Sequence, residues 1–443
     1  MRSLIVLSLA ITLLAQPGHC RPGKLSVADD TRAVAMPVLT QTKTGQVLLS
    51  WIEKDPGGLT SFYTALSADG GKTFAEKRLV YTANGIGTSR LMKPRILVQS
   101  NGTLMAVFAL RTETAVQAER SPAERSPAVP ALALHDHAAM NHDAAKPANA
   151  PATAPTPKEG GRGGRGPAST QIMVCTSTDN GQIWTAPQPV DSDKTPNLVR
   201  GFFDATVLSN GEVAVAYLKD VAGSTQHEER NLRLVVTQKG QFQPERIIDA
   251  EVCDCCNVSL LVDASGALNV YYRDNNDNIR DMARMVSTDN GLTFSAPQNL
   301  YADNWKINGC PHSGPSAIKL GNSALIAWFS GTTSNTAGVR VVTQTGERLA
   351  VIDDPSAKNA SLVEAPAAGV LLWDQLRGAT ETPVTGIAYR TFRAGKPSDM
   401  QWLANSDQGQ NASGLVVNNQ LIVAYELTRP GKPNALQLGY VAL

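Results

Sequence analysis

Long apolar runs are scarce in this chain of 443 residues. After residue 20 no segment approaches the roughly 18 uninterrupted apolar residues of a membrane-spanning helix, so we expect no membrane span. The N-terminus reads MRSLIVLSLAITLLAQPGHC, in which Arg2 precedes a short apolar core that Pro17 ends. This pattern is typical of a cleaved secretory signal over 1–20, and it predicts a secreted or periplasmic protein. Lipidation of Cys20 is the alternative, which the bulky histidine before it disfavours.

Neither sign of charge dominates the sequence. It contains 40 Lys and Arg against 39 Asp and Glu, a net charge of +1, and no basic block beyond a short Gly/Arg run. A nucleic-acid partner would require a basic surface, so we expect none. A monomer that binds a carbohydrate or a small anionic ligand remains compatible with this balance.

Helical periodicity is almost absent, and the sequence instead contains a repeated octet. The octets are SADGGKTF (67–74), STDNGQIW (177–184) and STDNGLTF (287–294). Each has Ser, Asp two residues later, Gly two after that, and a final aromatic. Such residues suit a tight hairpin, because the Asp can accept backbone N–H bonds, the Gly can take positive φ and the aromatic can fill the core beneath. Asp69, Asp179 and Asp289 are therefore predicted to be structural.

A second series consists of apolar runs that end in an aromatic residue. Successive aromatics are about 45 to 57 residues apart, except for one step of about 109 that contains a low-complexity insertion. Turn residues and further apolar stretches flank each run, which indicates four short strands per unit. The seven aromatics are Trp51, Phe108, Tyr217, Tyr272, Trp328, Trp373 and Tyr425.

Repeated four-stranded units predict an all-β fold, a β-propeller of antiparallel blades that forms a single domain over 24–443. We count seven blades, with six as the alternative; two β-sandwiches would not need so regular a step. The last unit has only three strands, while Leu25 to Val27 precedes the first blade without a partner. Pairing of these N- and C-terminal strands would close the ring.

The insertion spans 114–169, within blade 2. It is rich in Ala, Pro, Gly and Arg, and we expect it to be disordered because it cannot form a packed core. It contains HDHAAMNHD, with His135, His137, Met140 and His142. Such a tract either captures a soft metal ion or is simply a polar, flexible loop.

Only six cysteines occur, and three of them fall within four residues, in EVCDCCN. In a propeller of four-stranded meanders, this segment and GCPH (309–312) both join blades on the same face and flank the fourth blade. We therefore expect a cluster of Cys253, Cys255, Cys256 and Cys310, with His312 beside it. Cys175 lies in an apolar strand and is predicted to be buried.

Three chemistries are open to this cluster. An even number of cysteines in an oxidising compartment is compatible with two disulfides that staple neighbouring loops. Thiolates and an imidazole could instead bind copper(I) or zinc, although the spacing is not the usual C-x2-C. A redox-active pair is the third possibility. No other cofactor is indicated.

Polar residues on the same face could build a ligand pocket. A Tyr, Arg and Asp set at a propeller mouth can bind an anion or transfer protons, and the alternative is a solvated rim of loop charges. Our candidates for catalysis are Tyr272, Arg273 and Asp274, and those for ligand binding are Arg111, Arg200 and Arg280.

The octets resemble the Asp-boxes of the sialidase and BNR-repeat superfamily, whose members are β-propellers, most familiarly with six blades. The resemblance implies that the three octet aspartates shape hairpins on the face away from the ligand. Sialidases hold the sugar carboxylate with three arginines and use a tyrosine nucleophile, so it also implies glycoside hydrolysis. MKPRILVQSNGTLMAVFALR is similar to the family's segment around its first arginine, but Met92 stands at that position, between Arg90 and Arg95.

The combination of CDCC with GCPHSGP is also similar to secreted bacterial propellers that are labelled sialidase-like without an assigned reaction. The leading hypothesis is therefore a propeller that binds or hydrolyses a glycan at its loop face. The alternatives are a copper- or zinc-binding propeller and a non-catalytic interaction scaffold.

Overall fold

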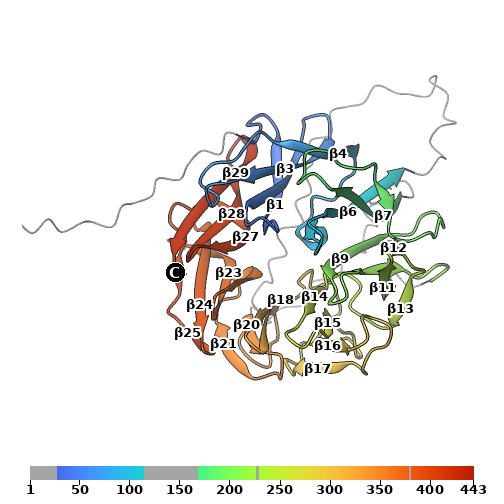
Figure 1. The fold of residues 1–443 in the computed structure, drawn as a ribbon. Helices are drawn as coiled ribbons and strands as arrows, with labels where there is room; N and C mark the ends of the chain where they lie inside the picture. Colours follow the sequence, from blue (N-terminus) through green and yellow to red (C-terminus); the bar gives the residue numbers. More distant parts are fainter. Residues whose placement is uncertain (1–26, 114–167, 226–228, 379–380) are drawn as a thin grey trace, which may run out of the picture.

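The computed structural model describes residues 27–113, 168–225, 229–378 and 381–443. The expected signal, the His/Met tract and nearly all of the insertion lie outside the described residues. The described chain forms seven antiparallel β-sheets arranged in a ring, with one 3-10 turn, η1 (Arg90–Met92). Figure 1 shows the ring, with the first and last sheets side by side. The predicted seven-bladed propeller is confirmed.

Each sheet follows the chain in order, so every blade is a meander. The strands of blades 1 to 3 are β1 (Ala33–Gln41), β2 (Val47–Lys54), β3 (Leu59–Ser67) and β4 (Arg78–Asn84); β5 (Arg95–Val98), β6 (Leu104–Glu113), β7 (Ala168–Ser177) and β8 (Gln188–Pro189); and β9 (Arg200–Val207), β10 (Val213–Asp220), β11 (Arg230–Gln238), β12 (Gln241–Phe242) and β13 (Arg246–Asp249). The insertion thus joins β6 to β7.

Blades 4 to 7 continue the same order. Their strands are β14 (Ser259–Val262), β15 (Leu268–Arg273), β16 (Met282–Ser287) and β17 (Gln298–Tyr301); β18 (Ser316–Leu320), β19 (Ser323–Ser330), β20 (Gly338–Thr343) and β21 (Arg348–Ile352); β22 (Lys358–Ala365), β23 (Ala368–Arg377), β24 (Val384–Arg393), β25 (Lys396–Pro397) and β26 (Gln401–Trp402); and β27 (Gly409–Val417), β28 (Gln420–Arg429) and β29 (Lys432–Ala442). In blades 3 and 6 the outer strand is split in two.

The seven predicted aromatics all lie on second strands and are at most 1 % exposed. Each packs toward the preceding blade, and six of them carry a polar atom that is hydrogen-bonded. Trp51 Nε1 donates to Glu53, Trp328 Nε1 to Asp303, and Tyr272 OH to Asp249, for example. Every such ring therefore fills an inter-blade core while its polar end is satisfied, as burial of Trp and Tyr requires.

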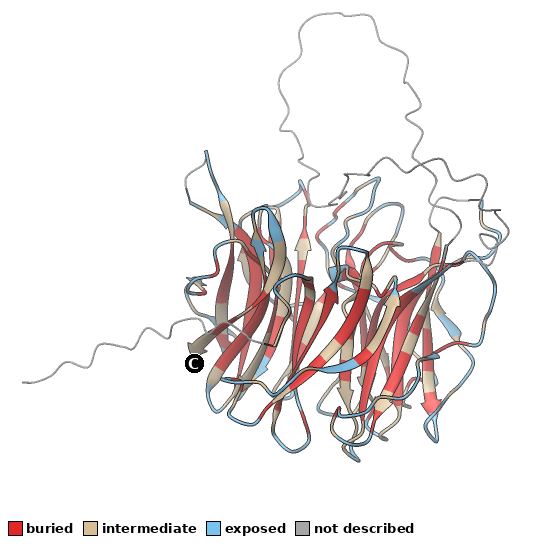
Figure 2. Ribbon diagram, turned by 90° about the horizontal axis from the view of Figure 1, so that it is seen from above, coloured by how far each residue is buried: buried red, intermediate tan, exposed pale blue. Residues whose placement is uncertain are grey.

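Buried residues lie mainly in the strands of the blades, and exposed residues gather at the loops above and below (Figure 2). The blades therefore hold together through apolar contacts between neighbouring sheets, which is the dominant favourable term in folding. No helix among the described residues is long and apolar enough to cross a membrane.

The octets form the turns between third and fourth strands of blades 1, 2 and 4. In the first, Ser67 Oγ donates to Asp69 Oδ1 at 2.7 Å and accepts from Gly71 N at 2.8 Å, while Thr73 N donates to Asp69 at 2.9 Å. These bonds hold the pKa of Asp69 well below its usual range. Gly71 has φ +85°, the conformation for which glycine was expected. The other two octets repeat the pattern.

The ring closes where blade 7 packs on blade 1. Strand β1 lies against β27, β28 and β29, and Met36 N donates to Glu426 Oε1 at 2.9 Å across the junction. The described part of blade 7 has three strands, and the predicted pairing of an N-terminal strand with it is not seen among the described residues. Leu25 lies outside the described residues, and Val27 packs half-buried against the shared core of blades 1 and 7.

First strands line the axis, and four of them contain a bulge. In β1, β9, β22 and β27 the register shifts where one residue adopts positive φ; these residues are Met36, Phe202, Asn359 and Asn411. A bulge bends the strand and changes the direction of its backbone groups. Here the bulges bend the ends of these four first strands toward the axis at one end of the ring.

Candidate functional site

The segments joining second to third strands, and blade to blade, lie on one end of the ring, which we call the loop face. The Asp-box turns lie at the other end. The structure places the cysteine cluster on the loop face as predicted, where the segment entering blade 4 meets the segment entering blade 5. Cys253, Cys255 and Cys256 are at most 2 % exposed, whereas Cys310 and His312 are exposed.

The ligand atoms form two groups of three. The sulfurs of Cys253, Cys255 and Cys256 lie within 4.8 Å of one another, and so do the sulfurs of Cys255 and Cys310 with a ring nitrogen of His312. Cys253 Sγ is 3.8 Å from Cys255 Sγ and 3.4 Å from Cys256 Sγ. No disulfide joins the five cysteines in the described part of the chain.

The sulfurs differ in their proton affinity. Contact with the Cys255 and Cys256 sulfurs holds the pKa of Cys253 well below its usual range, and the charges of Arg273 and Arg280 act in the same direction. Burial raises the pKa of Cys256 to about 12. Cys175, buried in β7 of another blade, has its pKa raised to about 11 by burial alone. The arrangement therefore favours one shared negative charge within the cluster.

Arg273 is buried and contacts only protein atoms. Its guanidinium donates to the carbonyl oxygens of Ser313, Arg280 and Phe329, and it stacks over the Trp305 ring with its central carbon 4.9 Å from the centroid. It is 2 % exposed. Arg273 therefore fixes the segment that carries Cys310 and His312.

Tyr272 and Asp274 flank Arg273 and do not meet in a shared pocket. Tyr272 is 1 % exposed and its hydroxyl donates to Asp249 Oδ2 at 2.5 Å, the same kind of contact that the other second-strand aromatics make. Asp274 is half-buried and accepts from Asn275 N and Asn276 Nδ2; burial raises its pKa. Only Asp274 of these two has an exposed portion.

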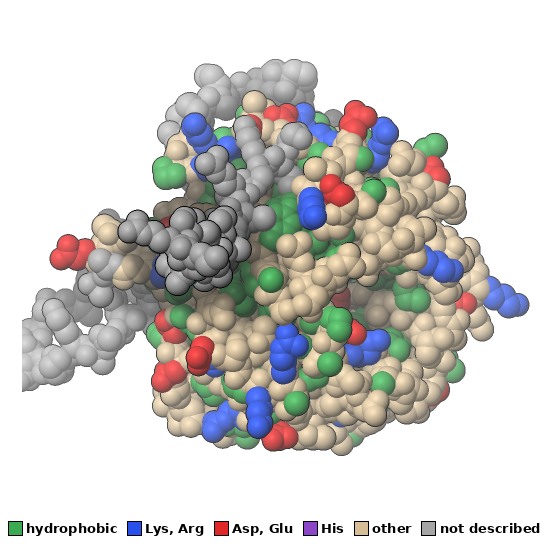
Figure 3. Space-filling model, turned by 60° about the vertical axis from the view of Figure 1, so that its left-hand side comes forward, with side chains coloured by type: hydrophobic (Ala, Val, Ile, Leu, Met, Phe, Trp, Pro, Cys, Tyr) green, Lys and Arg blue, Asp and Glu red, His purple; other side chains and the backbone are tan. Residues whose placement is uncertain are grey.

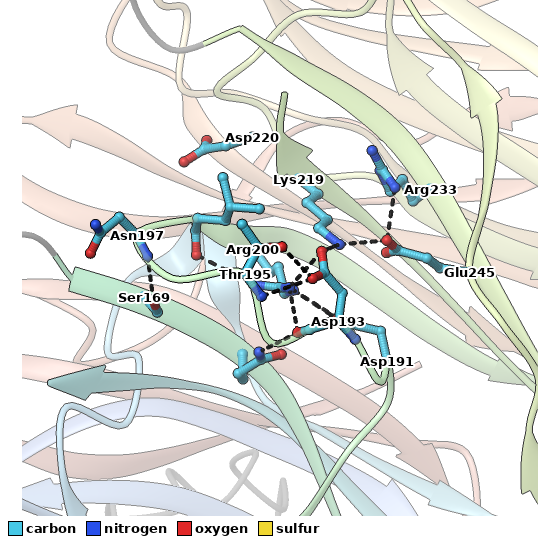
Figure 4. A network of polar contacts seen from close by, with 12 residues as sticks. Ser169, Asp191, Asp193, Thr195, Asn197, Arg200, Lys219, Asp220, Arg233 and Glu245 are labelled. Atoms are coloured by element: carbon cyan, nitrogen blue, oxygen red, sulfur yellow. Dashed lines mark hydrogen bonds and ion pairs between the residues drawn. The ribbon is translucent and has the colours of Figure 1, made fainter. Parts of the chain in front are cut away.

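Arg200 lies between blades 2 and 3 and is fully buried. Its Nε donates to Asp191 Oδ2 at 2.7 Å, and Nη2 donates to Asp193 O at 2.9 Å. Figure 4 shows that Lys219 joins the same network, where it contacts Asp193 and Glu245. No donor of Arg200 is left exposed, so the group braces two blades.

The other two ligand-binding candidates lie apart from each other. Arg111 is exposed on β6, where its backbone N–H donates to Gly85 O. Arg280 is 8 % exposed and lies near the cysteines, where its charge acts on Cys253 and Asp254. The structure therefore brings Arg273 and Arg280 to the cysteine cluster, and it leaves Arg111 and Arg200 elsewhere.

A cavity of about 380 Å³ lies on the propeller axis. All seven first strands contribute to it, together with the segments that carry Arg90 and His312. Three basic side chains from one short stretch line its wall: Arg90, Lys93 and Arg95. Arg95 Nε is 2.7 Å from Asp204 Oδ1, and Arg90 Nη2 donates to His312 O at 3.4 Å.

Two buried carboxyl groups are hydrogen-bonded to residues that line this cavity. Asp374 on β23 is 4 % exposed and Glu426 on β28 is 3 % exposed. Asn411 connects them, since its N–H donates to Asp374 Oδ2 at 3.0 Å and its Nδ2 donates to Glu426 Oε1 at 3.1 Å. Asn359 Nδ2 also donates to Asp374 Oδ2, at 2.6 Å, while Asp374 Oδ1 has no hydrogen-bond partner among the described residues.

The pKa values of Asp374, Glu426 and Lys93 are all shifted toward the neutral form of the side chain. Burial raises the pKa of Asp374 to about 6 and that of Glu426 to about 7. Burial, followed by the charge of Arg95, lowers the pKa of Lys93 to about 8. Groups shifted in this way are typical of functional sites, because they exchange protons near physiological pH.

Asp374 and Glu426 are not among the candidates selected from the sequence. Each directly follows the aromatic of a second strand, a position that faces the next blade. In blades 1, 2, 3 and 5 this position holds Ile52, Ala109, Leu218 and Phe329, whereas in blade 4 it holds Arg273. The sequence signal that could have identified Asp374 and Glu426 is a charged residue at a position that is apolar in four other blades.

Charged side chains of both signs are interspersed over the part of the described surface visible in Figure 3. Charge is therefore not segregated into a broad patch on this side, in agreement with the near-zero net charge. The basic group at the axial cavity is a local feature.

A family model described as a BNR repeat-like domain matches residues 160–352, somewhat less than half of the chain. No curated protein sequence is significantly similar to the chain.

Solved structures share the fold at low identity. A protein of unknown function from Dyadobacter fermentans is 13% identical, with a TM-score of 0.50 and coverage of 94% of this chain and 96% of that one. An ulvan lyase of polysaccharide lyase family PL25, bound to -[GlcA(1-4)Rha3S]-, is 10% identical, with a TM-score of 0.54 and coverage of 95% and 96%. Hadza microbial sialidase Hz136 is 13% identical, with a TM-score of 0.47 and coverage of 93% and 66%.

Proposed function

We propose that the chain, a seven-bladed β-propeller that matches a BNR repeat-like model over 160–352, binds an anionic glycan in the axial cavity of its loop face. The observation that carries the proposal is the basic wall of this cavity, formed by Arg90, Lys93 and Arg95. A volume of about 380 Å³ is within the range of small-ligand sites. Guanidinium groups pair bidentately with carboxylate and sulfate groups, which makes acidic sugars the fitting class.

Further support comes from Met92, which stands where the sialidase family has its first arginine. Met92 is half-buried and packs against the cores of blades 2 to 4, with its methyl group over Gly201, where a side chain would clash. Recognition of an acidic group would therefore fall to the basic side chains near Met92 that line the cavity, Arg90, Lys93 and Arg95. The ulvan lyase of similar fold is bound to a saccharide that carries both glucuronate and sulfate, which agrees with this ligand class.

We extend the proposal to glycan cleavage, with Asp374 and Glu426 as the proton carriers. Hydrolysis of a glycosidic bond uses a carboxylic acid that stays partly protonated near neutral pH, and burial raises the pKa of Glu426 to about 7 and that of Asp374 to about 6. The side chains around the cavity include no tyrosine, so the chemistry proposed here does not use a tyrosine nucleophile.

Binding is tested by calorimetric titration of sialyllactose and of sulfated and glucuronate-containing oligosaccharides, beside neutral lactose. We expect acidic glycans to bind at least about tenfold more tightly than lactose, which corresponds to roughly 1.4 kcal/mol. Arg90→Met and Lys93→Met should remove this preference. Lys72→Met is the matched control, because Lys72 is an exposed lysine in an Asp-box turn at the opposite end of the ring. Equal affinity for neutral and acidic glycans would contradict the proposal.

Cleavage is tested separately, by release of reducing ends from the acidic glycan that binds most tightly. Asp374→Asn and Glu426→Gln should abolish turnover while binding persists. If the wild-type protein binds but releases no product, the cleavage proposal fails and the binding proposal stands.

A further inference from the structure

The cysteine cluster is not used by the proposed glycan site and presents a chemistry of its own. Its buried part consists of the sulfurs of Cys253, Cys255 and Cys256, which come from one loop of four residues. Its exposed part consists of Cys310 and His312, from the segment entering the next blade. Cys255 belongs to both groups of three, so the two groups share one sulfur.

The distances between the sulfurs match those around a bound metal ion. Thiolates that bind a metal at about 2.3 Å lie roughly 3.8 Å apart around it. The sulfur of Cys253 is 3.8 Å from that of Cys255 and 3.4 Å from that of Cys256. The loop thus brings its thiols close to the spacing of metal ligands.

The surroundings of the cluster compensate negative charge. The guanidinium groups of Arg273 and Arg280 act electrostatically on Cys253, and Ser313 N donates to Cys256 Sγ at 3.4 Å. Contacts of this kind around the ligands orient them and stabilise an anionic metal–thiolate centre. Arg273 also binds the Ser313 carbonyl, so one residue serves both halves of the cluster.

We propose that this cluster is a copper(I) site in which the thiolate of Cys255 bridges two ions. One ion would be held by Cys253, Cys255 and Cys256, and the other by Cys255, Cys310 and His312. Soft thiolate ligands select copper(I), which is stable with three ligands, whereas structural zinc takes four. The grouping of the ligands in threes therefore favours copper(I). Exposure of Cys310 and His312 leaves a path by which the ions can enter.

The test is an anaerobic titration of the reduced full chain with copper(I), in competition with a chromophoric copper(I) chelator. His135, His137 and His142 are changed to Ala in every sample, so that the histidine tract outside the described residues does not contribute. The protein should bind two ions per chain and release protons as the thiols lose them. Cys175→Ser is the matched control, because Cys175 is buried in a different blade, and it should not alter this stoichiometry.

Two variants separate the two ions. Cys310→Ser combined with His312→Ala changes only exposed residues and should reduce binding from two ions to one. Cys255→Ser should abolish the bridged pair, and circular dichroism checks that this variant is folded. A stoichiometry that neither variant changes would overturn the proposal. So would preferential binding of one Zn²⁺ per chain that depends on residues of both groups, since that result indicates a four-ligand zinc centre.

Discussion

The guanidinium of Arg273 donates two hydrogen bonds to the carbonyl oxygen of Ser313, over 3.0 and 2.9 Å. This contact joins the second strand of blade 4 to the segment that carries Cys310 and His312. Arg273, a catalytic candidate from the sequence, therefore holds this segment in position.

Replacement of Arg273 by Met should destabilise the protein by about 3 kcal/mol, because several buried carbonyl oxygens lose their donor. It should also weaken copper(I) binding at the Cys255, Cys310 and His312 group, since their segment loses its anchor. Urea denaturation and the copper titration measure the two effects. Arg246→Met is the control: Arg246 also donates to two backbone carbonyls, but at an exposed position, and its loss should be small.

Replacement of Tyr272 by Phe should cost about 1 to 2 kcal/mol of unfolding free energy, because Asp249 loses a buried donor. Glycan affinity and turnover should remain unchanged, because the hydroxyl is buried away from the axial cavity. Activity assays beside thermal melting separate the two roles. A loss of turnover without a loss of stability would restore Tyr272 as a catalytic residue.

Arg200→Met should destabilise the protein by about 3 to 5 kcal/mol, because it leaves the carboxylate of Asp191 buried without its partner. Arg429→Met removes a contact to the exposed Asp30 and should change stability by less than about 1 kcal/mol. Chemical denaturation of both variants compares the two ion pairs directly. Similar losses of unfolding free energy in the two variants would show that burial does not make the Arg200–Asp191 pair more important for stability.

Binding of an acidic glycan should weaken as pH rises from 5 to 9. Asp374 and Glu426 have raised pKa values of about 6 and 7, so they become negative over this interval and oppose an anion. Lys93, with its pKa lowered to about 8, then loses its positive charge. Calorimetry across this range should show the decline, and Asp374→Asn with Glu426→Gln should remove its part below pH 8.

The same carboxyl pair predicts a dependence of stability on pH. Both groups bind protons more tightly in the folded state than in the unfolded state, where they titrate near 4. The folded state therefore holds more protons between about pH 4 and 7, and their contribution to stability declines as pH rises through this interval. The double variant should flatten that decline in thermal melts.

The blades could be predicted from the sequence because their determinants are local. Ser67, Asp69 and Gly71 make their turn within five residues, and an aromatic at the end of each second strand marks every blade. Counting strands was also enough to bring Cys310 to Cys255, because alternation of loops between two ends of a ring follows from the meander alone.

The axial group could not be predicted in this way, because its contacts are distant in sequence. Asp374 is bonded to Asn411, 37 residues later, and Glu426 to the backbone of Met36 across 390 residues. The bulges that direct these backbone groups inward arise from packing at the axis and leave no regular pattern in the chain. Composition could identify the charges, but only the structure shows that Asn411 connects Asp374 and Glu426.

The bond from Met36 to Glu426 also constrains how the molecule is made. Blade 1 is synthesised before blade 7, so the side of blade 1 that faces blade 7 is covered only after β27 to β29 have left the ribosome. Until those strands are present, the apolar side chains that blade 1 shares with blade 7 lack their partners. Blade 1 therefore depends on strands that are synthesised about 390 residues later to cover this core.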